Sequence, residues 1–292
     1  MAATILITGA SGLIGFRVLL AALAAGHNVR YTVRSEEKAQ VVSSNPAVRK
    51  LAPGDRLSPV IISDFSADGA FDTALRGVTH IVHAGSPPTV KITSGLLSSA
   101  LKAPTVQRVI ITSSIVANLG FTPPPPQLLP VPSTFGDVFE GYITGKIVEL
   151  HNTDEFVKTG NPHFTVSHVI PGYVFGRNEL ALDAAMMQTQ NSSNNFLMMG
   201  MVGGGDAPKA GEIEDFGVAT KVDYGSIFDL VEKTFPKAVE AGVFKRGKVP
   251  TLPVNYESSD VEKLLGRKLK TFDSAVVDVA SQYLEKLGKD KA

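Results

Sequence analysis

The amino-terminal stretch Thr4-Ile5-Leu6-Ile7-Thr8-Gly9-Ala10-Ser11-Gly12-Leu13-Ile14-Gly15 decides the fold. Its first five residues are apolar and β-branched, as in a strand that is buried on both faces of a parallel sheet. Three glycines follow at spacings of three and three, and a Leu- and Ala-rich stretch over residues 13–25 has the composition of a helix. A strand, a glycine turn and a helix in this order predict a dinucleotide-binding turn.

Each glycine of this turn has its own physical task. Gly9 permits the sharp turn, Gly12 lets a pyrophosphate approach the backbone, and Gly15 lets helix and strand pack closely. The helix amino terminus adds unpaired N–H groups and a positive dipole end. A purely structural turn is the alternative, but it does not explain why all three glycines occupy the required positions. The predicted cofactor contacts of the turn are Gly9, Ser11, Gly12, Leu13, Ile14 and Gly15.

Strand-like and helix-like segments alternate through the first 175 residues. Strands are expected at 28–33, 59–62, 79–83, 107–112 and 163–170, and helices at 71–75, 96–103 and 142–158. Such alternation implies right-handed βαβ units. We therefore predict the α/β class, with a Rossmann-type doubly wound parallel sheet and a small C-terminal substrate lobe.

The predicted domain organisation is one integrated unit with two parts. Residues 1–175 would form the NADP(H)-binding domain with the catalytic residues, and residues 176–292 mostly the substrate lobe, with the chain returning to the sheet near 215–220. Residues 186–201 are rich in Met, Asn and Ser, which predicts a flexible segment. Helical apolar spacing recurs at 227–241 and 272–287.

Composition excludes several classes of function. The chain has 292 residues, no cysteine, and 28 basic against 28 acidic residues. Without cysteine it cannot form a disulfide or a thiolate-held metal site. With a net charge of zero it has no overall positive field that would attract nucleic acid. The six histidines show no metal-ligand spacing. No apolar run reaches the ~18 residues of a membrane span, and no basic segment precedes the first apolar run. We expect a cytoplasmic monomer or homodimer without metal, membrane or nucleic-acid partners.

The end of the second strand favours NADPH over NADH. NAD-binding chains usually place an acidic residue there, whereas this chain has Arg34, followed one turn later by Lys38. Both can pair with a 2′-phosphate, although neighbouring glutamates weaken the signal and solvated surface charges are the alternative. Asp64, followed by Phe65, is a candidate contact for the adenine amino group, and a simple loop aspartate is the alternative. Ala84, after the strand at 79–83, is a further cofactor candidate.

Tyr142 and Lys146 are spaced four apart, which sets both on one face of a helix. A free phenol has a pKa of about 10, and a neighbouring ammonium favours the phenolate, so such a tyrosine can transfer a proton to a carbonyl oxygen. Ser113 and Ser114 follow the strand at 107–112 and supply a hydroxyl to polarise that carbonyl. A surface pair is the alternative, but the order of glycine turn, serines and Tyr-Lys favours chemistry.

Five segments together resemble the extended short-chain dehydrogenase/reductase family, and within it the dihydroflavonol, cinnamoyl-CoA and methylglyoxal reductase-like group. The segments are TGASGLIG (8–15), YTVR (31–34), VQRVIITSS (106–114), YITGK (142–146) and PGYVFG (171–176). The resemblance implies a reductase in which Ser114 polarises the carbonyl, Tyr142 is the acid/base and Lys146 is its partner. It also implies nicotinamide contacts from Pro171, Tyr173 and Val174.

The chain departs from the family near residues 85–92 and 203–214, where it is shorter. These departures put the substrate pocket in doubt, and the residues before Tyr142 argue against a CoA-thioester substrate. The predicted function is NADPH-dependent reduction of an aldehyde or ketone in a small molecule. The alternatives are a non-catalytic NADP(H)-binding regulator and an NAD-dependent sugar-nucleotide epimerase or dehydratase, which Arg34 disfavours.

Overall fold

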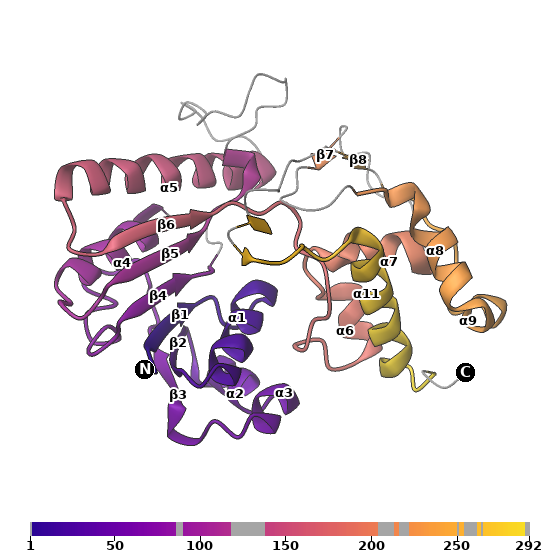
Figure 1. The fold of residues 1–292 in the computed structure, drawn as a ribbon, viewed down its shortest axis with the longest axis horizontal. Coiled ribbons are helices and arrows are strands. Elements are labelled where there is room, and N and C mark those ends of the chain that lie inside the picture. The colour runs from indigo at the N-terminus through magenta and orange to yellow at the C-terminus, as the bar shows by residue number, and fades with distance from the viewer. Residues whose placement is uncertain are drawn as a thin grey trace. The chain divides into compact units, whose positions relative to one another are not determined.

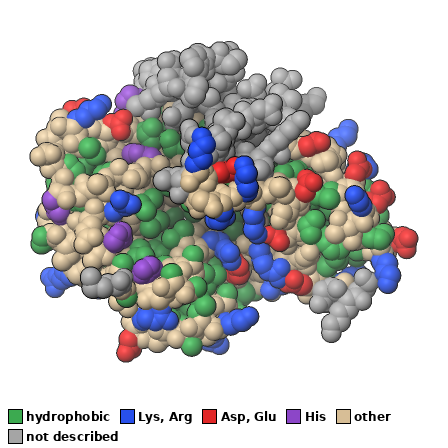
Figure 2. Space-filling view, viewed as in Figure 1, with side chains coloured by type: hydrophobic (Ala, Val, Ile, Leu, Met, Phe, Trp, Pro, Cys, Tyr) green, Lys and Arg blue, Asp and Glu red, His purple; other side chains and the backbone are tan. Residues whose placement is uncertain are grey.

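The structure is a computed structural model of the chain. It describes residues 2–85, 90–117, 138–203, 213–215, 222–249, 251–253, 262–263 and 265–289. The chain divides into two compact units, Met1–Ile170 and Pro171–Ala292. Basic and acidic side chains occur together on the face that Figure 2 draws, in line with their equal totals.

The first unit is built on a six-stranded sheet of order β3-β2-β1-β4-β5-β6, in which every neighbouring pair is parallel (Figure 1). Its strands are β1 (Thr4–Thr8), β2 (Asn28–Val33), β3 (Leu57–Ile61), β4 (His80–His83), β5 (Arg108–Thr112) and β6 (Thr165–Val169). The strand order reverses between β1 and β4, and such a switch point is where open α/β sheets bind ligands. The predicted Rossmann-type sheet is confirmed.

Helices cover both faces of this sheet, with α1 on one face and α4 and α5 on the other (Figure 1). The helices of this unit are α1 (Leu13–Ala24), α2 (Glu36–Ser43), α3 (Pro46–Lys50), α4 (Val90–Leu101) and α5 (Val138–Gly160), with 3-10 turns η1 (Gly54–Arg56) and η2 (Ile115–Ala117). The helices lie on opposite faces because strands are added to the sheet in one direction from β1 to β3 and in the other from β4 to β6, while every crossover stays right-handed.

The helix predicted at 71–75 is wrong, because these residues form turns. Phe71 and Leu75 are fully buried, so their spacing of four reflects two anchors in the core rather than a helix face. Gly69 and Gly77 bracket the segment with φ of 68° and 71°, a backbone region that interrupts a helix. Apolar spacing over so short a stretch does not distinguish turn from helix.

The second unit is mainly helical. Its elements are α6 (Ala184–Thr189), α7 (Asn194–Val202), η3 (Tyr224–Ser226), α8 (Ile227–Thr234), α9 (Pro236–Glu240), α11 (Phe272–Lys286) and a parallel pair of β7 (Ile213–Asp215) with β8 (Thr251–Pro253). The predicted return of the chain to the sheet at 215–220 falls mostly outside the described residues. The described strand next to it, β7, pairs with β8.

The segment at 186–201, predicted to be flexible, instead forms α6 and α7. Asp183 starts α6 by accepting a hydrogen bond from the backbone N–H of Met186. Met187, Met198 and Met201 are buried in the core of this unit, where an unbranched thioether side chain fills irregular space. Packing therefore accounts for these methionines. No helix among the described residues is long and apolar enough to cross a membrane.

Candidate active site

The glycine turn has the close approaches that require glycine. Gly9 has a φ of +72°, and a Cβ atom there would lie 2.7 Å from the carbonyl of Ala84 and from the N of Gly85. A Cβ atom at Gly15 would lie 2.2 Å from the Gly9 oxygen. Gly12 stands at the amino terminus of α1, and its N–H donates to that same oxygen at 3.0 Å. The residues therefore fit a phosphate-binding turn packed against the first helix.

A cavity of about 340 Å³ lies beside this turn, at the carboxyl ends of β1, β2 and β4. Its lining residues are Thr8, Gly9, Ser11, Thr32, Val33, Arg34, Ser35, Lys38, Phe65, Phe71, His83, Gly85 and Ile92. The sequence-based predictions included Gly9, Ser11, Arg34, Lys38 and Phe65 among these. They did not include Thr8 or Thr32, although each stands near the end of a parallel strand, where this edge of the sheet gathers ligand contacts.

The remaining predicted contacts of this unit are not among the residues that line the cavity. Leu13 and Ile14 occupy the first turn of α1, and the main chain of Ala84 packs against Gly9. Asp64 precedes Phe65, and its Oδ1 accepts hydrogen bonds from the side chain and backbone of Ser66 at 2.6 and 2.8 Å. These bonds, with the Ser66 hydroxyl first, hold the pKa of the Asp64 carboxyl below its ordinary value.

Two cations stand at the β2 end of the cavity. The Arg34 guanidinium carbon lies 5.7 Å from the centroid of the Phe65 ring, and Lys38 is exposed in the first turn of α2. Ser35 caps this helix by accepting a hydrogen bond from the Lys38 N–H. Thr32 is buried, and its hydroxyl has no hydrogen-bond partner among the described residues. This arrangement can receive a phosphate and a hydroxyl-bearing group.

The residues predicted to transfer a proton or polarise the carbonyl lie on α5 and directly after β5. Tyr142 and Lys146 are one turn apart on the same helix face, and Lys146 is 4% exposed. The Lys146 ammonium donates to the Thr112 carbonyl at 2.9 Å, so it is held against the end of the strand that Ser113 and Ser114 follow. Both serines are buried. The structure thus brings Lys146 and the serine segment together.

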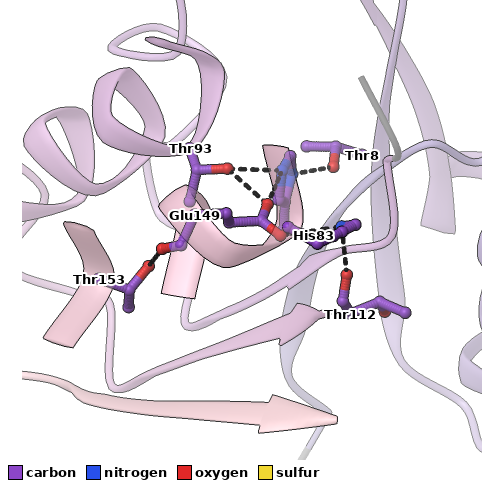
Figure 3. A network of polar contacts seen from close by, with 7 residues as sticks. Thr8, His83, Thr93, Thr112, Glu149 and Thr153 are labelled. Atoms are coloured by element: carbon purple, nitrogen blue, oxygen red, sulfur yellow. Dashed lines mark hydrogen bonds and ion pairs between the residues drawn. The ribbon is translucent and has the colours of Figure 1, made fainter. Parts of the chain in front are cut away.

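A buried polar network surrounds Lys146 (Figure 3). Its ammonium lies 2.8 Å from Oε2 of Glu149, and Oε1 of Glu149 accepts a 2.8 Å hydrogen bond from Thr93 on α4. Thr93 lies 3.2 Å from Nε2 of His83, whose Nδ1 lies 2.6 Å from the Thr8 hydroxyl. Neither Glu149 nor Thr93 is among the site residues predicted from the sequence. The position of Glu149, three residues after Lys146 on the same helix face, was the available signal.

Burial is the main influence on the histidines near this network. It lowers the pKa of His83 to about 4, against a raising effect of Glu149 and a further lowering by Lys146. Burial also lowers the pKa of His168 on β6, while Asp154 and Glu149 act in the opposite direction. His83 is therefore a neutral imidazole at neutral pH.

The three predicted nicotinamide contacts belong to the start of the second unit. The Tyr173 ring lies 4.6 Å from the ring centroid of Phe196 and 6.1 Å from that of Phe175. Pro171 and Val174 flank it in an irregular segment. Among the described residues, no group of three or more His, Asp or Glu side chains could hold a metal ion.

The chain matches a family model and is similar in sequence to curated proteins along nearly its whole length. The NAD(P)H-binding family model matches residues 9–165. Ketoreductase CTB6 of Cercospora nicotianae is 30% identical, over 98% of this chain and 96% of the relative. The NAD-dependent epimerase/dehydratase ALT6 of Alternaria alternata is 31% identical, over 91% and 93%.

Solved structures with the same fold include two reductases. Yeast methylglyoxal/isovaleraldehyde reductase, solved with NADPH, superposes with a TM-score of 0.73 at 19% identity, over 98% of this chain and 99% of the yeast chain. Vestitone reductase from alfalfa superposes with a TM-score of 0.66 at 18% identity, over 98% and 99%.

Proposed function

Since the chain belongs to the extended short-chain dehydrogenase/reductase family, a family of NAD(P)H-binding oxidoreductases, we propose that it is an NADPH-dependent reductase that converts an aldehyde or ketone in a small molecule into an alcohol. One observation carries this proposal: the buried Lys146 ammonium shares a helix face with Tyr142 and touches the end of β5, where Ser113 and Ser114 begin. A structural surface pair would not need a buried, oriented ammonium.

The proposed roles follow from the chemistry of each side chain. NADPH, when bound, supplies the hydride that reduces the carbonyl carbon. Ser114 donates a hydrogen bond that orients and polarises the carbonyl, and Tyr142 gives its proton to the nascent alkoxide. Lys146 stabilises the phenolate that Tyr142 leaves behind. Among the described residues, Thr112 and Glu149 accept two of its three N–H groups, which leaves the third for a cofactor hydroxyl.

The choice of NADPH rests on Arg34 and Lys38 at the cavity that the glycine turn borders. A planar guanidinium beside the Phe65 ring and an ammonium at a helix amino terminus suit a 2′-phosphate. Two similar proteins also support NADPH as the cofactor. The yeast reductase was solved with NADPH. A relative from Candida albicans, 30% identical over 59% of this chain, is named an NADPH-dependent methylglyoxal reductase. The name of ALT6 refers instead to NAD.

The decisive experiment is a panel of aldehydes and ketones assayed with NADPH and NADH in parallel. We expect carbonyl-dependent oxidation of NADPH, and we expect Tyr142→Phe to lower kcat by about 10²–10⁴-fold while it keeps NADPH binding. Full turnover by this variant would refute the assigned mechanism. Tight NADPH binding without turnover across the panel would favour a regulatory protein, and NAD retained through purification would favour an epimerase or dehydratase.

Several further features stay predictions from the sequence. They are the substrate lobe at 176–292, the nicotinamide contacts of Pro171, Tyr173 and Val174, the monomeric or homodimeric state and the cytoplasmic location. Besides NADPH, the proposed chemistry requires one partner, a small carbonyl compound.

A further inference from the structure

The hydrogen bonds around Thr93 determine where the protons of the buried network lie (Figure 3). Its single hydroxyl proton faces two groups, Oε1 of Glu149 at 2.8 Å and Nε2 of His83 at 3.2 Å. The Glu149 carboxylate, opposite the Lys146 ammonium, can only accept, so Thr93 donates to it and offers His83 a lone pair. The ring proton of His83 is therefore on Nε2, and its Nδ1 accepts from the Thr8 hydroxyl.

The neutral state of His83 agrees with this arrangement. Burial lowers the pKa of His83 to about 4, so at neutral pH the ring has one proton and one lone pair to place. With both nitrogens engaged by hydroxyl groups, only one tautomer satisfies every hydrogen bond of the network. The donors then point one way, from Thr8 through His83 and Thr93 to Glu149.

Glu149 also determines the direction of the Lys146 ammonium. The two side chains are 7% and 4% exposed, and their charged atoms are 2.8 Å apart. Thr112 accepts a second N–H of Lys146 at 2.9 Å. With the Nζ atom and two of its N–H bonds fixed, the third N–H has a fixed direction as well. In an exposed lysine, the flexible side chain would leave the directions of the N–H bonds undetermined.

We propose that Glu149 is a positioning residue: its carboxylate fixes the Lys146 ammonium at the end of β5 and, through Thr93, fixes the tautomer of His83. The role in turnover rests on the proposed function, in which Lys146 assists Tyr142. The same hydrogen-bond chain ends at Thr8, which precedes Gly9 and lines the cavity. It therefore joins the helix that bears Tyr142 to the turn that would receive the cofactor phosphates.

The variant Glu149→Gln tests the proton arrangement. Its amide oxygen should turn toward the Lys146 ammonium, because the amide NH₂ group would be repelled there. The NH₂ group then donates to Thr93, which must give its own proton to Nε2 of His83. We expect the His83 proton to move to Nδ1, where it donates to Thr8. In Glu149→Asp, which keeps the charge, we expect the wild-type tautomer.

Thr153→Val is the matched control. The Thr153 hydroxyl is buried and donates at 2.8 Å to the main-chain oxygen of Glu149, so its loss weakens the same part of α5 without touching the carboxylate. We expect a lower melting temperature for this control and unchanged His83 signals. The tautomer is read from ¹⁵N-histidine NMR spectra of the full chain without cofactor, with His83→Gln to assign the signals.

Turnover provides the second readout. We expect Glu149→Gln to lower kcat by about 10–100-fold, the scale of a small misplacement of a reacting group, with KM for the carbonyl compound changed less than about threefold. Glu149→Asp should recover part of kcat, and Thr153→Val should keep the wild-type value. Wild-type kcat in Glu149→Gln would overturn the positioning role.

The tautomer also tests the proposal without any variant. A wild-type His83 with its proton on Nδ1 would overturn it even if Glu149→Gln does not fold. The NMR measurement needs neither substrate nor NADPH, so the two proposals can fail separately. If no carbonyl compound is reduced but the tautomer changes as expected, the hydrogen-bond arrangement holds and the proposed reductase function fails.

Discussion

The Lys146 ammonium lies 2.8 Å from the Glu149 carboxylate, three residues further along α5, and the two side chains are only 4% and 7% exposed. A buried pair of this kind depends on both partners, because each charge alone has lost its hydration. Lys102 and Asp72 form a pair of similar length, 2.9 Å, with side chains that are 62% and 40% exposed. The two pairs therefore differ in burial but hardly in the distance between nitrogen and oxygen.

Lys146→Met should destabilise the fold far more than Lys102→Met. Removing Lys146 leaves an uncompensated buried carboxylate, which typically costs about 3–5 kcal/mol, whereas an exposed pair contributes at most about 1 kcal/mol. Urea unfolding of the two variants beside the wild type measures both values. Equal losses would show that burial does not govern the strength of these pairs.

Gly9→Ala should abolish cofactor binding and lower stability. The added methyl group would lie 2.7 Å from the backbone of Ala84 and Gly85, neither of which can move aside cheaply, and the φ of +72° adds strain. Gly26→Ala is the control, since Gly26 has a similar φ of +83° but no atom within 4 Å of the added carbon. We expect a loss of about 1–2 kcal/mol for the control and more for Gly9→Ala.

Thermal unfolding and NADPH titration by fluorescence measure these effects. Gly26→Ala should bind NADPH with the wild-type affinity. If Gly9→Ala binds NADPH equally well, the turn does not approach the cofactor phosphates.

Arg34→Ala should weaken NADPH binding selectively. Loss of a charge-assisted hydrogen bond of about 1.5–3 kcal/mol raises the Kd for NADPH by about 10–100-fold, while the Kd for NADH changes less than about threefold. Arg49→Ala, an exposed arginine outside the cavity lining, is the matched control. Parallel weakening of both cofactors would remove the assignment of Arg34 to the 2′-phosphate.

His83 should make the fold sensitive to acid. Burial lowers its pKa from 6.5 to about 4, so the unfolded chain binds a proton more readily than the folded chain between these values. The contribution of His83 to stability is complete above about pH 6.5 and is lost as pH falls toward 4. The difference corresponds to about 3 kcal/mol.

Urea unfolding of the wild type and of His83→Gln across this pH range measures the effect. The variant should be less stable at neutral pH but should lose less stability on acidification. Identical pH dependence in the two proteins would place the acid sensitivity elsewhere, for example at His168, whose pKa is also lowered by burial.

Local patterns were enough to predict much of the fold and part of the site. The strand at residues 4–8, the glycine turn and the start of α1 are consecutive in the chain, and their geometry depends on backbone sterics and on the period of apolar residues. The shared helix face of Tyr142 and Lys146 likewise follows from a spacing of four. Arg34 was located by its place directly after β2.

Where the pattern was short or ambiguous, only packing decided the structure. Phe71 and Leu75 have helical spacing but are held in turns by burial in the core. The Met-rich segment at 186–201 contains little alternation, yet α6 and α7 form there because buried methionines anchor them. In both cases the partners that bury the side chains come from distant parts of the chain.

The sequence by itself determined the individual strands, the glycine turn and the shared helix face of Tyr142 and Lys146, because each depends on residues a few positions apart. The tertiary structure alone decided that Glu149 faces Lys146 inside a network reaching Thr8. Thr93 joins Glu149 across 56 residues, and His83 joins Thr8 across 75. Such contacts arise only when β1, β4, α4 and α5 pack together, since burial selects polar partners by position in space rather than by spacing along the chain.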